Sequence, residues 1–175
     1  RNADLLAKVL EKENKDGKIE IQVRGRTITI RIREAGSFTS GSAVLNANFL
    51  PIMTKLRTAL RSILGSIGVE GHTDDVPISF GEFRSNWDLS AARALSVAHE
   101  LIKTNELDNS RFMVVGHAET KPHKPNLDDE SRALNRRVEI IIRQGLDMQT
   151  EEEIRKIQSM NPEVMEIIQQ LSNDI

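Results

Sequence analysis

The chain has 175 residues, 38% hydrophobic and 29% charged, which suits one globular domain with a real core and some appended segments. Its net charge of −2 and its few aromatics (five Phe, one Trp, no Tyr) argue against nucleic-acid binding. The sequence has no cysteine, which excludes disulfides, zinc–thiolate sites and a cysteine nucleophile, and it has no apolar run of the ~18 residues needed to span a membrane.

In chain order, the first predicted elements are a helix and a hairpin. Residues 3–13 carry four apolar side chains spaced for one face, which predicts a short amphipathic helix within an N-terminal linker of residues 1–17. This helix is short enough that it must lean on the domain body or on a second copy. Residues 18–33 alternate between apolar and polar types around an Arg-Gly-Arg turn and predict a β-hairpin. Residues 37–42 are polar, and we expect a flexible turn there.

A helix, a strand and a loop are predicted next. Residues 46–64 follow the helical period, with Pro51 either at the first helical position or at a kink. Residues 66–71 are an apolar run that ends in glycine and predict a buried strand. Residues 72–88 are polar and interrupted by proline and glycine, so they predict a loop. It lies at the carboxyl edge of the strand, where open α/β sheets bind ligands.

The second long helix is predicted from Asp88 to about residue 103, with Asp88 or Ser90 as its N-cap. Two apolar runs, residues 111–116 and 136–143, predict the remaining strands. Between them, residues 117–134 contain two prolines and predict a long polar loop.

These elements together predict an α/β (α+β) fold. The order hairpin, helix, strand, helix, strand, loop, strand indicates a two-layer domain over residues 18–145, with a mixed sheet packed against helices. Residues 146–175 form a helical appendage after a break near Gly145. One helix opens at a capping box beginning with Thr150 and another at Pro162. Their apolar faces need a partner surface.

Opposite charges converge on the loop after the strand of residues 66–71. Asp74 follows that strand, and Arg93 falls at the third position of the helix if Ser90 is the N-cap. A cation there opposes the helix dipole unless a ligand anion lies between it and the free N–H groups. Because Asp74 suits a cation, the pair can grip a zwitterion such as the free end of an amino acid. The alternative is an Asp74–Arg93 ion pair that locks the loop.

Several motifs resemble those of OmpA-like peptidoglycan-binding domains, and the resemblance extends from Ile19 to Ile142. Within that superfamily the doubled Asp74-Asp75 before Val-Pro, followed by Asn-Trp, is similar to MotB and PomB, the stator B subunits of the bacterial flagellar motor, with the sodium-driven PomB as the narrower expectation. The motifs are FTSGSAVL (38–45), GHTDDVP (71–77), SNWDLSAARA (85–94), RFMVVGHAETKP (111–122) and SRALNRRVEI (131–140).

The resemblance implies a ligand, the diaminopimelate of the peptidoglycan stem peptide, and a set of residues that hold it. Asp74 would bind its ammonium and Arg93 its carboxylate. Asn86 and the backbone N–H groups of two following residues would add hydrogen bonds, and an arginine near the last strand would line the groove. Thr73 and the Ser-Gly-Ser turn of residues 40–42 would lie on the rim. The implied ligand-binding residues are Thr73, Asp74, Asn86, Leu89, Ser90, Arg93 and Arg137, the last with Arg136 as its neighbour.

The resemblance also implies a biological role without catalysis, metal or cofactor. The chain would be the periplasmic anchoring region of a stator subunit, whose peptidoglycan binding holds the ion-driven torque generator in place. Its expected partners are peptidoglycan, a second copy in a homodimer, a membrane channel subunit of the MotA/PomA type and flagellar basal-body ring proteins, with no nucleic acid. Because the sequence begins at Arg1 rather than Met, we expect a fragment of an inner-membrane protein whose transmembrane segment lies outside it.

Other interpretations of these residues stay open. One alternative is a general wall-tethering module of the OmpA/Pal type, and another is an interaction module in which the pocket is unused. A metal-dependent hydrolase would use His72, Asp74 and Asp75 with His117, although no HExxH helix and no clear remaining ligands accompany them. Trp87 is interpreted as a packing anchor for the loop, with stacking on a glycan ring as the alternative.

Overall fold

The structure, a computed structural model, describes residues 2–78, 81–145 and 148–173. The chain forms two compact units, residues 1–144 and 145–175. In the described parts, no helix has the length and apolar character needed to cross a membrane. The first unit carries the sheet and all of the predicted site residues.

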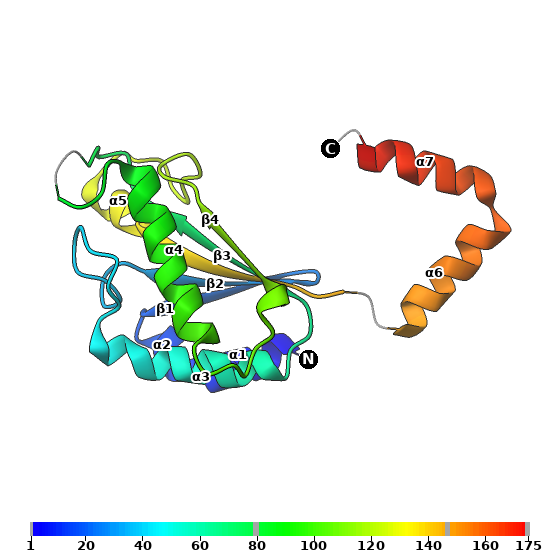
Figure 1. Ribbon diagram of the computed structural model, residues 1–175, viewed down its shortest axis with the longest axis horizontal. Helices are drawn as coiled ribbons and strands as arrows, with labels where there is room; N and C mark the ends of the chain where they lie inside the picture. Colours follow the sequence, from blue (N-terminus) through cyan, green and yellow to red (C-terminus); the bar gives the residue numbers. More distant parts are fainter. Residues whose placement is uncertain (1, 79–80, 146–147, 174–175) are drawn as a thin grey trace. The chain divides into compact units, whose positions relative to one another are not determined.

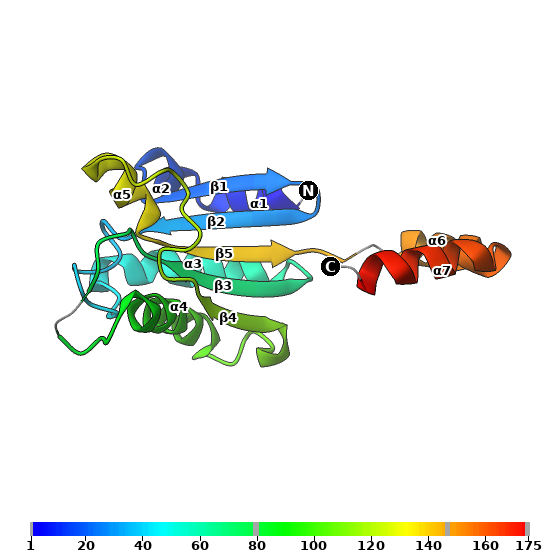
Figure 2. The ribbon, with the colours of Figure 1, turned by 90° about the horizontal axis from the view of Figure 1, so that it is seen from above.

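A mixed five-stranded sheet is the centre of the first unit, as predicted (Figures 1 and 2). Its spatial order is β1-β2-β5-β3-β4, and only the β3–β4 pair is parallel. The hairpin and the other strands lie where their patterns placed them, but the strand of residues 112–116 lies at the sheet edge with Met113 and Val114 exposed, so its apolar run does not mark a buried strand. The strands are β1 (Ile19–Arg24), β2 (Thr27–Arg33), β3 (Ser66–His72), β4 (Phe112–Gly116) and β5 (Arg137–Arg143).

Helices cover one face of this sheet and enclose the core (Figure 2). They are α1 (Asn2–Val9), α2 (Glu11–Lys15), α3 (Leu50–Arg61) and α4 (Asn86–Ile102). A 3₁₀ turn, Ala47–Phe49, precedes α3, and Pro51 sits in its first turn. Proline is tolerated there because its missing N–H has no partner to lose, so the helix is not kinked. The inward side chains alternate along each central strand, for example Ile28, Ile30 and Ile32 on β2, all buried.

The N-terminal helix is divided in two and belongs to the domain body. The expected single helix of residues 3–13 is divided at Leu10 into α1 and α2. Leu6 and Leu10 are fully buried in the main core, and Glu13 accepts a 2.6 Å hydrogen bond from Lys55 of α3. The helix was expected to pack on the domain body or on a second copy, and in this structure it packs on the domain body.

Close contact between α4 and two strands fixes where the site is built. A Cβ atom on Gly71 would lie 1.9 Å from the carbonyl oxygen of Ser90, and one on Gly116 would lie 2.7 Å from the backbone nitrogen of Ala91. Only glycine permits so close an approach of helix and strand. As a result, the start of α4 lies directly beside the loop that follows β3.

Three element boundaries differ from the prediction. Helix α4 begins at Asn86, with Ser85 rather than Asp88 or Ser90 as its N-cap. The predicted loop of residues 117–134 contains α5 (Asp129–Asn135), which Asp128 caps by accepting from Ser131 N. In the second unit, α6 (Met148–Met160) begins two residues before Thr150, and α7 (Pro162–Asn173) begins as predicted.

Candidate functional site

A cavity of about 620 Å³ opens at the edge of the sheet where β3 ends. Its walls come from the segment after β2, the loop after β3, the start of α4 and the residue before β5. Two carboxylates and two guanidinium groups contribute to the lining. The lining residues are Glu34, Ser40, Gly41, Thr73, Asp74, Val76, Pro77, Ile78, Gly81, Asn86, Leu89, Arg93 and Arg136.

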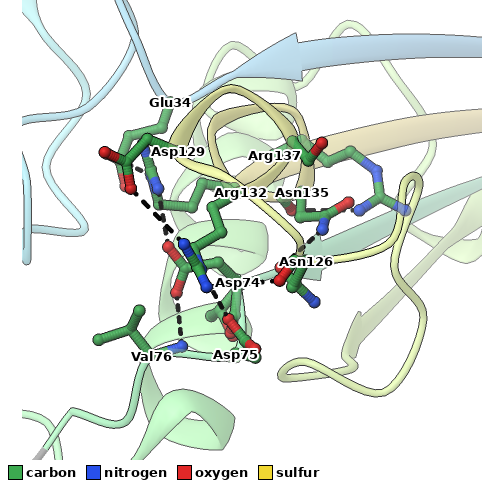
Figure 3. Close-up of polar contacts among 12 residues, drawn as sticks. Glu34, Asp74, Asp75, Val76, Asn126, Asp129, Arg132, Asn135 and Arg137 are labelled. Atoms are coloured by element: carbon green, nitrogen blue, oxygen red, sulfur yellow. Dashed lines mark hydrogen bonds and ion pairs between the residues drawn. The ribbon is translucent and has the colours of Figure 1, made fainter.

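Asp74 is held in this cavity by the loop that carries it. The side chain is 8% exposed. Its Oδ1 accepts a 3.0 Å hydrogen bond from Val76 N, and its Oδ2 accepts a 2.7 Å hydrogen bond from Arg136 Nη1 (Figure 3 shows the Val76 contact). Thr73 supports the turn by donating from Oγ1 to the Asp74 carbonyl at 2.8 Å. The carboxylate therefore faces the cavity in a fixed position.

Arg93 forms the deepest basic group of the cavity and is only 2% exposed. Its Nη1 donates to Glu34 Oε2 at 2.6 Å, while Nε and Nη2 donate to the carbonyls of Ser42 and Thr39 at 2.8 and 3.2 Å. The guanidinium also lies 5.0 Å from the ring centre of Phe38. The turn of residues 37–42, predicted to be flexible, is thus held by Arg93.

The four charged groups form an alternating chain across the cavity. Glu34 accepts from Arg93 and, through Oε1, from Arg136 Nε at 3.2 Å, and Arg136 in turn donates to Asp74. Asp74 and Arg93 are therefore linked through Glu34 and Arg136, and the direct ion pair considered from the sequence is replaced by this chain. Burial alone would lower the pKa of Arg136, but its contacts with Asp74 and Glu34 raise it.

Arg136, not Arg137, is the arginine that lines this cavity, which corrects the predicted position. Successive side chains of a strand point to opposite faces. Arg137 consequently lies in a second cavity of about 490 Å³, where its Nε donates to Glu139 Oε2 at 2.8 Å. Its Nη1 and Nη2 donate to the carbonyls of Asn135 and Lys121. Arg137 and Glu139 thus form an ion pair within β5.

Three other predicted site residues, Asn86, Leu89 and Ser90, lie in the first turns of α4. Asn86 lines the cavity and donates from Nδ2 to the Val76 carbonyl at 3.1 Å. Leu89 also lines it, but its backbone N–H donates to the Ser85 carbonyl and so is not available to a ligand. Ser90 is fully buried and accepts from Ala118 N at 3.0 Å, so it ties α4 to the segment after β4.

This helix start also removes the dipole argument for Arg93. With Asn86 as the first helical residue, Arg93 lies two turns into α4 rather than at the third position. The helix-end effect falls off within the first turn. The ion pair with Glu34, 59 residues away in the sequence, is what offsets the buried charge of Arg93.

Two contributors to the site escaped the sequence interpretation. Glu34 follows β2 directly, and only the folded arrangement brings it beside Arg93 and Arg136. Arg132 of α5 donates from Nε to Asp75 Oδ1 at 3.1 Å, which Figure 3 shows as a contact between α5 and the loop after β3. The sequence signal for this contact is Asp128, a suitable N-cap that predicts the helix carrying Arg132.

The possible metal ligands do not converge. His72 lines the second cavity with Arg137, whereas Asp74 lines the first. His72 stacks on His117 with ring centres 4.8 Å apart. Burial, together with the positive charge of Arg137, lowers the pKa of His72 to about 3. Within the described residues, no three or more side chains of metal-binding type are placed to hold an ion.

Known proteins resemble the chain over most of its length. Motility protein B of Bacillus subtilis is 35% identical over 142 residues, which cover 76% of this chain and 53% of that protein. The cell wall anchor of the T6SS from Pseudomonas aeruginosa is 36% identical with a TM-score of 0.75, covering 80% of this chain and 97% of that one. A putative MotB like protein from Desulfovibrio vulgaris is 26% identical with a TM-score of 0.76, covering 82% and 92%.

The family assignment rests on a further match, to a family pattern that covers more than half of the chain. The chain spans about half the length of the curated relatives it matches. The pattern of the OmpA family matches residues 37–136, a range that contains every residue lining the first cavity except Glu34. The chain therefore belongs to the OmpA family.

Proposed function

We propose that this chain anchors a flagellar motor stator to the cell wall by binding peptidoglycan non-covalently. It would be the periplasmic region of an inner-membrane subunit that assembles with a channel partner of the MotA/PomA type. Family membership and the similarity to Motility protein B support this role. The homodimer and the contact with basal-body ring proteins are predictions of the same role.

The observation that carries the proposal is the charge balance of the first cavity. Its wall offers two carboxylates, Asp74 and Glu34, and two guanidinium groups, Arg93 and Arg136. A zwitterion fits such a wall because its ammonium and carboxylate can each face the opposite sign without leaving a buried charge unpaired. The free end of diaminopimelate in a stem peptide carries both groups on one carbon.

Hydrogen-bonding capacity remains for such a ligand. A guanidinium carries five N–H groups. In the part of the chain that the structure describes, Arg93 uses three of them and Arg136 uses two. Each Asp74 oxygen accepts one bond there and has a further lone pair. We infer that the ammonium binds Asp74, and that the carboxylate binds Arg93 from the cavity floor and Arg136 from the half-exposed side.

A sedimentation assay with purified peptidoglycan tests this assignment. Asp74→Asn is expected to weaken binding at least ~10-fold, because it removes the charge that faces the ammonium while keeping the shape of the side chain. Arg93→Lys is expected to lose most binding, since an ammonium cannot reproduce the guanidinium fork. Asp16→Asn, an exposed carboxylate away from the cavity, is the matched control and should bind normally.

Two ligand controls sharpen the assay. Free meso-diaminopimelate should release the wild-type protein from the wall. Peptidoglycan with lysine in place of diaminopimelate retains the ammonium but lacks the carboxylate and should bind weakly. Equal binding of both wall types, or normal binding by Asp74→Asn with an unchanged melting temperature, would refute recognition of the zwitterion.

A wall anchor for another assembly is the second candidate. The similarity to the T6SS cell wall anchor supports it, because its identity of 36% is about equal to the 35% shared with Motility protein B. Both candidates predict the same cavity chemistry. Expression of the full-length protein in cells that lack their own stator B subunit separates them: restored swimming supports the stator role, and wall binding without motility supports the alternative.

A further inference from the structure

Trp87, the only tryptophan of the chain, points into solvent at the start of α4. Its side chain is 53% exposed. Sequence reasoning favoured a packing anchor, but Trp87 takes no part in the hydrophobic core. An exposed aromatic face beside a ligand cavity is free to pack on a ligand that fills that cavity.

A shallow cavity of about 220 Å³ adjoins this indole ring. Its lining combines apolar groups with two exposed carboxylates, Asp75 and Glu119. Asp75 is fixed by the 3.1 Å contact from Arg132, yet 46% of its side chain remains exposed. The full lining is Asp75, Pro77, Ile78, Ser85, Asn86, Trp87 and Glu119.

The shallow cavity adjoins the cavity of Asp74. Pro77, Ile78 and Asn86 line both. A ligand that fills the larger cavity therefore reaches the indole ring by crossing this shared wall. Whatever Trp87 contacts must be attached to that ligand by a short tether.

The chemistry of the shallow cavity matches a sugar ring. One face of a pyranose presents C–H groups that pack on an aromatic face, and its hydroxyl groups donate to carboxylates. Trp87 supplies the aromatic face, and Asp75 and Glu119 supply the acceptors. The two carboxylates disfavour an anionic ligand group, and the small volume suits one ring rather than a protein surface.

Peptidoglycan provides a short tether of this kind. In the stem peptide, two amino acids separate diaminopimelate from the lactyl group of the N-acetylated sugar. A sugar so connected can reach only a site that adjoins the diaminopimelate cavity.

We propose that Trp87, with Asp75 and Glu119, forms a carbohydrate subsite for the N-acetylated sugar that carries the stem peptide. This inference rests on the proposed function, because it places the rest of the same ligand. Trp87 thereby makes the protein prefer glycan-linked stem peptides over free ones, without contacting diaminopimelate itself.

The single tryptophan allows a direct test by fluorescence. Two soluble probes are titrated into the protein: the free tripeptide that ends in diaminopimelate, and the same tripeptide attached to its disaccharide. Both should bind, but only the disaccharide form should change the Trp87 emission, and it should bind about 3- to 10-fold more tightly. Trp87→Ala, followed by calorimetry, should lower the affinity for the disaccharide form to that of the tripeptide and leave the tripeptide unaffected.

Two variants control for effects on folding. Trp87→Phe keeps an aromatic face and should retain most of the preference. Val23→Ala removes another half-exposed apolar side chain, on β1, and should change neither affinity. If the wild type binds both probes equally, or if Trp87→Ala keeps the preference, the subsite is wrong while the diaminopimelate site stands. If the wild type binds neither probe, the proposed function fails and the subsite fails with it.

Discussion

Arg93 donates from Nη1 to Glu34 Oε2 at 2.6 Å, and both side chains are nearly enclosed, at 3% and 14% exposure. This pair joins α4 to the segment that follows β2. Because Glu34 also accepts from Arg136, it carries the connection onward to the arginine that holds Asp74. The geometry of the cavity therefore depends on an acidic residue that does not stand in any of the recognised motifs.

Glu34→Ala is expected to lower the free energy of unfolding by about 3 kcal/mol, because it leaves the buried Arg93 charge without its carboxylate. Urea denaturation monitored by circular dichroism measures the change. The control is Glu106→Ala, which breaks the exposed pair with Arg61 and should cost less than about 1 kcal/mol. Similar losses in the two variants would show that the Glu34 pair adds nothing beyond a surface contact.

Substitutions of Arg136, which precedes β5, and of Arg137, the first residue of β5, should have different effects. The first should affect binding and the second stability. Arg136→Gln is expected to weaken peptidoglycan binding about 10-fold, because Arg136 faces the first cavity and has N–H groups left for a carboxylate. Arg137→Gln should leave binding nearly unchanged and instead reduce stability, since it strips Glu139 of a buried partner. Sedimentation with peptidoglycan and thermal melting, run on both variants, decide the matter; a loss of binding confined to Arg137→Gln would contradict the placement.

The sequence predicted the parts of this fold that depend on local pattern. The strict alternation in β1 and β2 identified the hairpin, and the apolar runs identified β3, β4 and β5. Asp74 and Arg93 were placed on one cleft because one follows a buried strand and the other lies early in the next helix. These inferences needed only the period of the side chains and the direction of the chain.

The rest depended on tertiary contacts or on competing local signals. The sequence pointed to Asp88 or Ser90 as the cap of α4, but Ser85, a residue of equally suitable type a few positions earlier, is the cap in the structure. Arg136 and Arg137 differ only by the strand register that turns one of them to each side. Glu34 meets Arg93 across 59 residues, so no local rule could pair them.

Stability should depend on pH through His72. Its pKa is lowered to about 3 from 6.5, first by burial and then by Arg137, and the other groups that act on it are Glu139, His117 and Arg31. Between these two values the unfolded chain binds more protons than the folded chain, so stability falls as the pH falls. From pH 7 to pH 5 the linkage relation gives a loss of about 2 kcal/mol.

His72→Leu should abolish that loss. Neither ring nitrogen of His72 has a hydrogen-bond partner in the described part of the chain, so an apolar replacement removes a proton-binding group without orphaning another. Urea titrations at pH 7 and pH 5 give the comparison. At pH 8 and above, where His72 is neutral in both states, the two proteins should show parallel pH dependence; an equal loss of stability toward pH 5 would rule out His72 as the source.

Gly71→Ala should disrupt the packing of α4 against β3. The new Cβ would lie 1.9 Å from the Ser90 carbonyl oxygen, so helix and strand must separate, and we expect a loss of more than about 3 kcal/mol. Gly145→Ala is the control, because a Cβ there meets no atom within 4 Å, and it should stay within about 0.5 kcal/mol. Since α4 carries both Asn86 and Arg93, the Gly71 variant should also bind peptidoglycan more weakly at temperatures where it is still folded. Full binding by that folded variant would mean that the cavity does not depend on this close approach.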